Sequence, residues 1–310
     1  MTRPHHSFRG EEMEHHSFVY TTDDTRLTVS ESGSADAPLH IVFCHGLALS
    51  QHIWGPQWRS LTNHLGDRAH LVFYDQRGHG NSQESCSGPD GYSIAQLGAD
   101  LATVIDHTCL SGPVMAVGHS LGGMSILSLA HHHPDIAARL TGAALISTAA
   151  HSLSAMGIGR ALHTPAVPLL EHVVDHAPAI THYLWNLARA AAGPMLGIPV
   201  KRTLARDDRA SIRAVIGILT ALRDHDETAG LALLNELPHC LVACGEADPV
   251  TPLQHSLNLR QQMPNARLLT AARAGHMLPL ERPRLINDAL IAMATSLAPA
   301  CVPAPTLVTA

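Results

Sequence analysis

The alternation of short apolar runs with longer amphipathic segments is the feature of this sequence that most constrains its fold. Four apolar runs and the three helical segments between them lie at 39–44, 58–65, 70–74, 94–109, 113–117, 121–132 and 142–147. A strand without a polar face must be buried on both sides, which is typical of a parallel sheet covered by helices on both faces. The pattern therefore predicts an α/β fold.

The alternation stops near residue 151 and resumes near residue 238. The segment between them has helical stretches at 180–192 and 210–223 that prolines interrupt, so we interpret it as an inserted helical cap. Strand signals return at 240–244 and 266–270, and a hairpin over 17–31 completes an expected eight strands. The predicted divisions are a disordered N-terminus at 1–16, a core at 17–150 and 238–297, a cap at 151–237, and a C-terminal tail at 298–310.

Charge and cysteine usage limit the classes of partner and location. The 310-residue chain has a formal net charge of -6 and no basic block, which disfavours nucleic acid and anionic membrane surfaces as partners. No run of about 20 apolar residues suggests a membrane span. The six cysteines form no C-x-x-C pair and the N-terminus lacks an apolar signal, so a cytoplasmic location is predicted. A small neutral or apolar molecule is the expected ligand, and the oligomeric state is not predicted.

A G-x-S-x-G motif at 118–122 lies between an apolar run and a helical segment. Glycines two residues before and after Ser120 permit a turn so tight that a Cβ atom would collide with neighbouring backbone. The turn places the serine hydroxyl at a helix N-terminus, where free N–H groups and the helix dipole can stabilise a developing anion. Ser120 is therefore the candidate nucleophile, and the alternative is a glycine-rich helix start capped by a serine.

A serine nucleophile needs a histidine base, and the base needs a carboxylate that fixes its tautomer. An acidic pair follows the apolar run at 240–244, where the carboxyl end of a strand would lie. We predict Asp248 as the acid because Pro249 holds it in an extended conformation from which it can reach sideways. Glu246 is the local alternative.

Histidine is unusually abundant, with 24 copies against 20 lysines and arginines. A single histidine is most often a solvated surface residue, and 131–133, just before a proline, are interpreted as the end of a helix. The histidine pairs at 5–6 and 15–16 occur in a tetrad too short to be a structural repeat. His276 is the histidine in the loop after the last predicted strand, so it is the candidate base.

Several stretches together resemble the α/β-hydrolase family over about residues 17–297, in its serine esterase-like branch. They are His45-Gly46-Leu47, the loop at 75–82, the G-H-S-L-G-G elbow at 118–123, and the loops that carry Asp248 and His276. The resemblance implies an eight-stranded, mostly parallel sheet with helices on both faces and an inserted helical cap. It also implies that the 75–82 loop, including Arg77, is structural.

The resemblance further implies how the site is built. In such enzymes two backbone N–H groups form an oxyanion hole, and they correspond here to Leu47 and Leu121. Haloalkane dehalogenases and epoxide hydrolases of this fold use an aspartate at the elbow, so Ser120 disfavours both. No P-loop, G-x-G-x-x-G or zinc signature occurs, so neither a cofactor nor a metal is expected.

The predicted activity is hydrolysis of small to medium hydrophobic carboxylic esters through an acyl-enzyme on Ser120. Apolar cap residues such as Trp185 and Leu196 either cover the serine or only pack on the core. A cofactor-free perhydrolase or haloperoxidase and a C–C bond hydrolase are alternatives with the same catalytic residues. A non-catalytic ligand receptor on this fold is a further alternative, which negligible turnover would distinguish.

Overall fold

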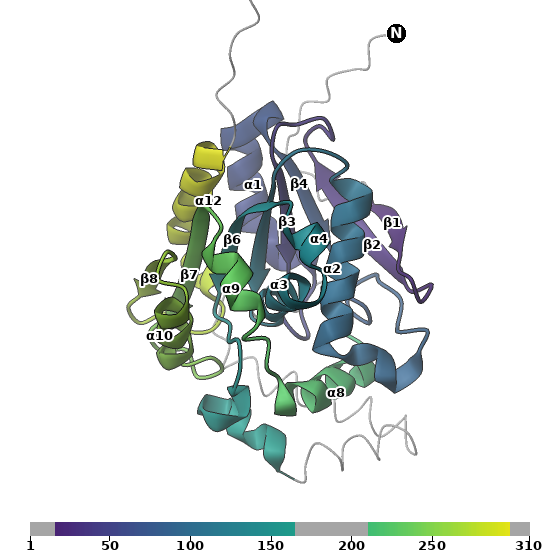
Figure 1. Ribbon diagram of the computed structural model, residues 1–310, viewed down its shortest axis with the longest axis vertical. Coiled ribbons are helices and arrows are strands. Elements are labelled where there is room, and N and C mark those ends of the chain that lie inside the picture. Colours follow the sequence, from purple (N-terminus) through teal and green to yellow (C-terminus); the bar gives the residue numbers. More distant parts are fainter. Residues whose placement is uncertain (1–15, 165–209, 298–310) are drawn as a thin grey trace, which may run out of the picture.

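The computed structural model describes residues 16–164 and 210–297, and these contain one eight-stranded sheet (Figure 1). Its strands are β1 (His16–Tyr20), β2 (Arg26–Ser32), β3 (His40–Cys44), β4 (His70–Tyr74), β5 (Val114–His119), β6 (Leu140–Ile146), β7 (His239–Gly245) and β8 (Arg267–Ala271). Their order across the sheet is β1-β2-β4-β3-β5-β6-β7-β8. Strand β2 runs antiparallel to β1 and β4, and the other pairs are parallel. The predicted mostly parallel, eight-stranded sheet is confirmed.

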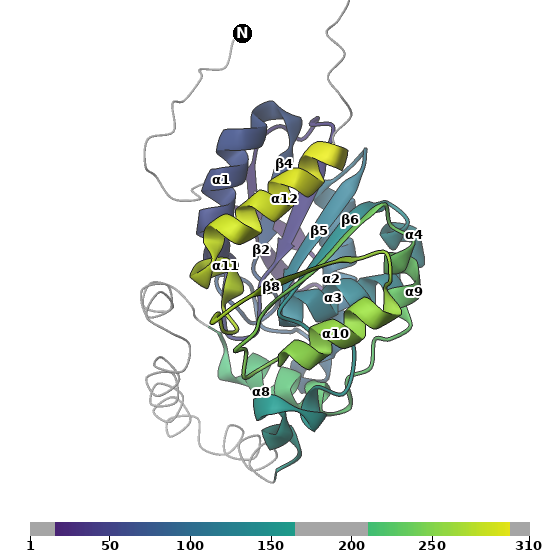
Figure 2. The ribbon, with the colours of Figure 1, turned by 90° about the vertical axis from the view of Figure 1, so that its left-hand side faces the viewer.

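Helices cover both faces of this sheet (Figure 2). One face carries α1 (Gly55–Leu65), α11 (Leu278–Glu281) and α12 (Pro283–Leu297). The other carries α2 (Ile94–Thr108), α3 (Leu121–His132), α4 (Pro134–Ala137), α9 (Gly230–Asn235) and α10 (Leu253–Gln262). None of the helices in 16–164 and 210–297 is long and apolar enough to cross a membrane.

Alternate residues of the central strands enter two separate apolar cores. On β3, Ile41 and Phe43 join the core under α1 and α12, whereas Val42 and Cys44 join the core under α2 and α3. Phe43 stacks on Phe73 of the neighbouring β4, with ring centroids 4.5 Å apart. Burial of both faces explains why β3 and β4 are apolar at every position after their first residues, His40 and His70.

A third apolar cluster joins the predicted cap to the carboxyl edge of the sheet. The described part of the cap has the short helices η4 (Leu153–Ala155), η5 (Gly157–His163), α8 (Ile212–Ala221) and η6 (Leu222–Asp224). Ala214 and Ile218 of α8 pack with Leu121 and Met124 of the first turn of α3. The helix predicted at 210–223 is therefore present as α8 and η6. The helix predicted at 180–192, which includes Trp185, lies outside the described residues, and so does Leu196.

Helix α9 was not anticipated, and its residues fall in the segment that the sequence interpretation assigned to the cap. It packs on α3, and a Cβ atom on Gly230 would collide with the Leu127 carbonyl oxygen of that helix. Three further short helices, η1 (Gln51–Trp54), η2 (Gly66–Arg68) and η3 (Gly88–Tyr92), lie in loops between strands. The domain boundaries themselves stay a prediction.

Arg77 is buried in a network of ion pairs with Asp23 and Asp100. Its guanidinium donates to both Asp100 oxygens at 2.7 Å and to the Asp23 oxygens at 2.9 and 3.0 Å. The Arg77 side chain is completely buried, so it cannot reach a bound molecule. This agrees with the structural role expected for the 75–82 loop.

Candidate active site

Ser120 lies between β5 and α3 in a conformation that only glycine adopts readily, with φ 53° and ψ -116°. A Cβ atom on Gly118 would lie 2.5 Å from the Gly122 backbone, and one on Gly122 would collide with the Cys44 carbonyl oxygen. These contacts explain the two glycines of the motif. Backbone strain of this kind costs about 1–3 kcal/mol and is concentrated at functional positions.

Asp248 and His276 approach each other from the loops that follow β7 and β8. The distance from Asp248 Oδ2 to His276 Nδ1 is 2.8 Å. Asp248 Oδ1 accepts the N–H groups of Val250 and Thr251 at 2.8 and 2.9 Å, and the Thr251 hydroxyl donates to Oδ2 at 2.7 Å. Burial opposes ionisation of Asp248, but the bonds from His276 and Thr251 outweigh it and lower its pKa. An ionised carboxylate therefore lies beside the imidazole.

Glu246, the alternative acid, is placed differently. Its side chain is exposed, and its Oε1 accepts the Thr270 hydroxyl at 3.0 Å. Of the two carboxylates considered from the sequence, only Asp248 contacts His276.

The loop that carries His276 is held on both sides. The Glu281 carboxylate accepts the N–H groups of Gly275 and Met277 at 2.7 and 3.1 Å. The Nε2–H of His119 donates to the His276 carbonyl oxygen at 2.9 Å, and the two rings lie 5.0 Å apart between centroids. Since His119 directly precedes the elbow serine, this bond fixes the His276 loop next to the elbow.

The Ser120 hydroxyl and His276 Nε2 are the two groups that would exchange a proton. Neither the Ser120 hydroxyl nor His276 Nε2 has a hydrogen-bond partner within 16–164 and 210–297. The His276 side chain is 10% exposed and Ser120 is 9% exposed. Hydrogen bonds between a nucleophile and its base often tighten only when substrate binds.

The predicted oxyanion donors are also without partners in the described chain. The N–H groups of Leu47, in the loop after β3, and of Leu121, the first residue of α3, donate to no other described residue. The Leu47 loop is held by the buried His79, whose Nε2 accepts the Ala48 N–H at 3.1 Å. Two orphan donors near the elbow are what an oxyanion hole requires.

Within the described ranges, the residues with metal-ligand spacing do not lie at this site. They are His131, His132 and Glu227, near the C-terminus of α3. Ser120 is at the N-terminus of the same helix, and twelve residues at 1.5 Å each separate the two ends by about 18 Å.

Sequence reasoning assigned no role to His119, Thr251 or Glu281. Thr251 follows Asp248 by three residues, a spacing at which a hydroxyl and a backbone N–H commonly bond to an aspartate. Glu281 also acts locally, because it bonds to N–H groups only four and six residues before it. His119 instead contacts the His276 loop across the fold, through the arrangement of β5 and β8, and no local sequence signal indicates that contact.

Buried histidines around the site predict that the fold weakens in mild acid. Burial lowers the pKa of His45 to about 4 and the pKa values of His79 and His119 to about 3. Below pH 6.5 the unfolded state therefore binds more protons, and the free energy of unfolding falls with pH down to about pH 3–4. Each histidine that stays neutral contributes a loss of about 2 kcal/mol between pH 7 and pH 5. Urea denaturation at pH 7.5, 6.0 and 5.0 measures this decline.

Two variants test whether the pH effect comes from buried histidines. His255 is buried in α10 with a lowered pKa, so His255→Gln should reduce the slope, whereas the exposed His64→Ala should not. The carboxylates with lowered pKa values, such as Glu31, lose their contribution only near pH 4 and below. Equal free energies of unfolding at pH 7.5 and 5.0 would contradict the prediction.

Comparison with known proteins bears on the family and the fold. The alpha/beta hydrolase family model matches residues 41–289. The "Putative carbamate hydrolase RutD" of Caulobacter segnis is 28% identical over 263 residues, which cover 81% of this chain and 89% of that protein. The 3-oxoadipate enol-lactonase 2 of Acinetobacter baylyi is 26% identical over 280 residues, covering 90% and 97% of the two chains. The structure of a thermophilic esterase from Thermogutta terrifontis is similar with a TM-score of 0.68 at 20% identity, covering 92% and 100%.

The family match extends over most of the chain and includes the elbow and the loops of Asp248 and His276. The known esterase structure has the same fold over nearly all of its length. This chain therefore belongs to the alpha/beta hydrolase family.

Proposed function

We propose that this protein is a serine hydrolase that cleaves small to medium hydrophobic carboxylic esters through an acyl-enzyme on Ser120. The observation that carries the proposal is the 2.8 Å contact between Asp248 and His276 beside a serine in a strained strand-to-helix turn. The names of the relatives, which specify a carbamate hydrolase, an enol-lactonase and an esterase, support hydrolysis as the type of reaction.

In the proposed reaction, His276 Nε2 accepts the hydroxyl proton of Ser120 as the serine oxygen attacks the acyl carbon. Asp248 holds the Nδ1–H tautomer and stabilises the imidazolium that forms. The imidazolium then protonates the leaving alcohol, and a water molecule that His276 deprotonates releases the acid. The N–H groups of Leu47 and Leu121 stabilise the anionic oxygen of both tetrahedral intermediates.

The surroundings of the serine support an uncharged, apolar substrate. The first turn of α3 packs against apolar side chains from the cap and from η3, including Tyr92, Leu153 and Ile218. Apolar walls with a few convergent polar groups are typical of sites for small organic ligands. Trp185 and Leu196 of the cap, which the sequence leaves as either covering the serine or packing on the core, are taken in this proposal to line the acyl site.

Carbamate hydrolysis is the second candidate, because the RutD proteins that this chain resembles carry that name. A carbamate has the same acyl carbon, so the same serine, base and oxyanion donors would serve. Its nitrogen makes the carbonyl less electrophilic, so esters with the same leaving group should react faster in a site built for esters.

The proposal is tested with p-nitrophenyl acetate, butyrate and octanoate beside p-nitrophenyl N-methylcarbamate. We expect the ester kcat/KM to exceed the carbamate value and to change with acyl length, because each methylene contact is worth about 1–3 kcal/mol. A higher kcat/KM for the carbamate would favour the second candidate. Peracid formation on adding hydrogen peroxide and acetate would favour the perhydrolase alternative. Turnover no greater than buffer with every substrate would contradict the proposal.

A further inference from the structure

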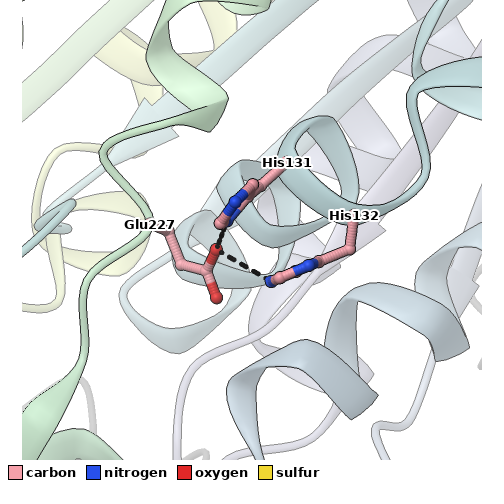
Figure 3. Close-up of side chains that lie close together, drawn as sticks. All are labelled: His131, His132 and Glu227. Atoms are coloured by element: carbon pink, nitrogen blue, oxygen red, sulfur yellow. Dashed lines mark hydrogen bonds and ion pairs between the residues drawn. The ribbon is translucent and has the colours of Figure 1, made fainter.

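A cluster of two histidines and a glutamate lies at the end of α3 that is remote from Ser120 (Figure 3). His131 Nδ1 lies 2.8 Å from Glu227 Oε2, and His132 Nε2 lies 3.4 Å from the same oxygen. The two rings stack with centroids 3.9 Å apart. Neighbouring residues on a helix do not share a face. Both rings reach Glu227 here because His131 contacts it through Nδ1, the ring nitrogen nearer the backbone, whereas His132 contacts it through Nε2, the nitrogen farther from the backbone.

Backbone contacts fix the segment that carries Glu227 against α3 independently of the cluster. The Glu227 N–H donates to the Ala150 carbonyl oxygen at 2.8 Å, and the Gly230 N–H donates to the Glu227 backbone carbonyl oxygen at 3.1 Å. Gly230 packs directly against the backbone of α3 at Leu127. The two sides of the cluster are therefore fixed relative to each other, so the site would be largely formed before a ligand binds.

The buried Glu227 carboxylate has no permanently charged cation beside it in the described part of the chain. The Glu227 side chain is 7% exposed, and in the described ranges its side-chain ion-pair partners are His131 and His132, with no lysine or arginine. A buried carboxylate that lacks a cation is costly. The C-terminal end of α3 also favours a cation, because the helix dipole is negative there. His131 and His132 are 36% and 39% exposed, so an ion could enter from solvent.

We propose that His131, His132 and Glu227 bind a divalent transition-metal ion, with Zn²⁺ as the ion that fits best. Two imidazole nitrogens and one carboxylate oxygen form a known three-ligand set for zinc, with water in the fourth position. Metal–ligand bonds of about 2.0–2.2 Å in a tetrahedron require ligand atoms about 3.3 Å apart. The three ligand atoms lie within 4.8 Å of one another, so adjustments of side-chain torsions suffice.

The ion would join the end of α3 to the segment by which the chain returns from the predicted cap. Glu227 follows η6 by three residues, and His131 and His132 lie in the last turn of the helix that begins next to Ser120. At about 18 Å from the serine the ion takes no part in the acyl transfer. Its effect is to stabilise the connection between α3 and the 224–227 segment. The proposal does not depend on the esterase assignment.

The test is isothermal titration calorimetry of the full-length protein with ZnCl2 at pH 7.5, repeated for four single variants. Glu227→Gln keeps the shape and the hydrogen-bond acceptor but removes the charge, and His132→Ala removes one nitrogen ligand. The matched controls are Glu236→Gln, an exposed glutamate just after α9, and His64→Ala, an exposed histidine on α1. All five proteins also carry alanine at the N-terminal histidine pairs, which could chelate zinc themselves: His5, His6, His15 and His16.

We expect one zinc equivalent whose Kd rises at least about tenfold in Glu227→Gln and in His132→Ala and stays unchanged in both controls. Zinc at about 100 times its Kd should also raise the Tm by about 5 °C in the parent and both controls, but not in Glu227→Gln or His132→Ala. Thermal melting without zinc shows whether each variant is folded. If Glu227→Gln does not fold, His132→Ala still tests the proposal, because His132 is exposed and its replacement should not disturb the core. The same zinc isotherm for the parent and for His132→Ala would overturn the proposal, as would an equal loss of affinity in His64→Ala.

Discussion

Replacing Ser120 with alanine is expected to lower kcat for p-nitrophenyl butyrate by about a million-fold, while the free energy of unfolding changes little. Loss of a serine nucleophile removes the covalent route entirely, and comparable knockouts cost about that much. Alanine keeps the Cβ atom of Ser120, so the strained turn at φ 53° is equally strained in the variant. Steady-state kinetics with urea denaturation on the same protein measures both quantities.

Ser128 provides the matched control. It lies on the same helix, its hydroxyl is buried, and that hydroxyl has no hydrogen-bond partner in the described chain. Ser128→Ala should leave kcat within about twofold of the parent. A Ser120→Ala variant that retains more than about one hundredth of the parent kcat would contradict the assignment of Ser120 as the nucleophile.

Replacing Asp248 with asparagine should lower kcat by about ten thousand-fold without unfolding the protein. The asparagine amide group would face His276 Nδ1 and favour the tautomer in which Nε2 carries the proton, so Nε2 could no longer accept one from Ser120. The asparagine carbonyl oxygen can still accept the Val250 and Thr251 N–H groups that bond to Asp248. The same kinetic assay, with thermal melting as a check on folding, measures the effect.

Glu246→Gln is the control for the acid. Glu246 is exposed and bonds to Thr270, so its replacement should change kcat by less than about threefold. The opposite result, in which Glu246→Gln is severe and Asp248→Asn is mild, would make Glu246 the acid.

The fold could be predicted largely because it depends on burial, which sequence records directly. Strands such as β3 and β4 are buried on both faces, so each of their residues after the initial histidine has an apolar or aromatic side chain or is a cysteine. The glycines at 118 and 122 likewise indicate from the sequence alone that backbone atoms approach closely at these two positions. Helix α9 was missed because six residues are too short for helical periodicity to be distinguished from a loop.

The candidate site was predictable where a residue lies next to a strand end and unpredictable where it acts across the fold. Asp248 and His276 each follow a strand, and parallel strands bring their carboxyl ends to one edge. The bond from His119 to the His276 carbonyl oxygen joins residues 157 positions apart. The contact of His131 and His132 with Glu227 joins α3 to a segment 96 positions later, so these histidines were interpreted only as a helix end.

Labelling with a fluorophosphonate, followed by mass spectrometry of the digested protein, tests the central claim most directly. The reagent forms a covalent bond with a serine only when that serine is activated by a base. We predict one adduct, on Ser120, that is absent in Ser120→Ala and strongly reduced in Asp248→Asn. An adduct on a different residue, or ester turnover that persists in a protein that takes up no label, would contradict the assignment of Ser120 as the nucleophile.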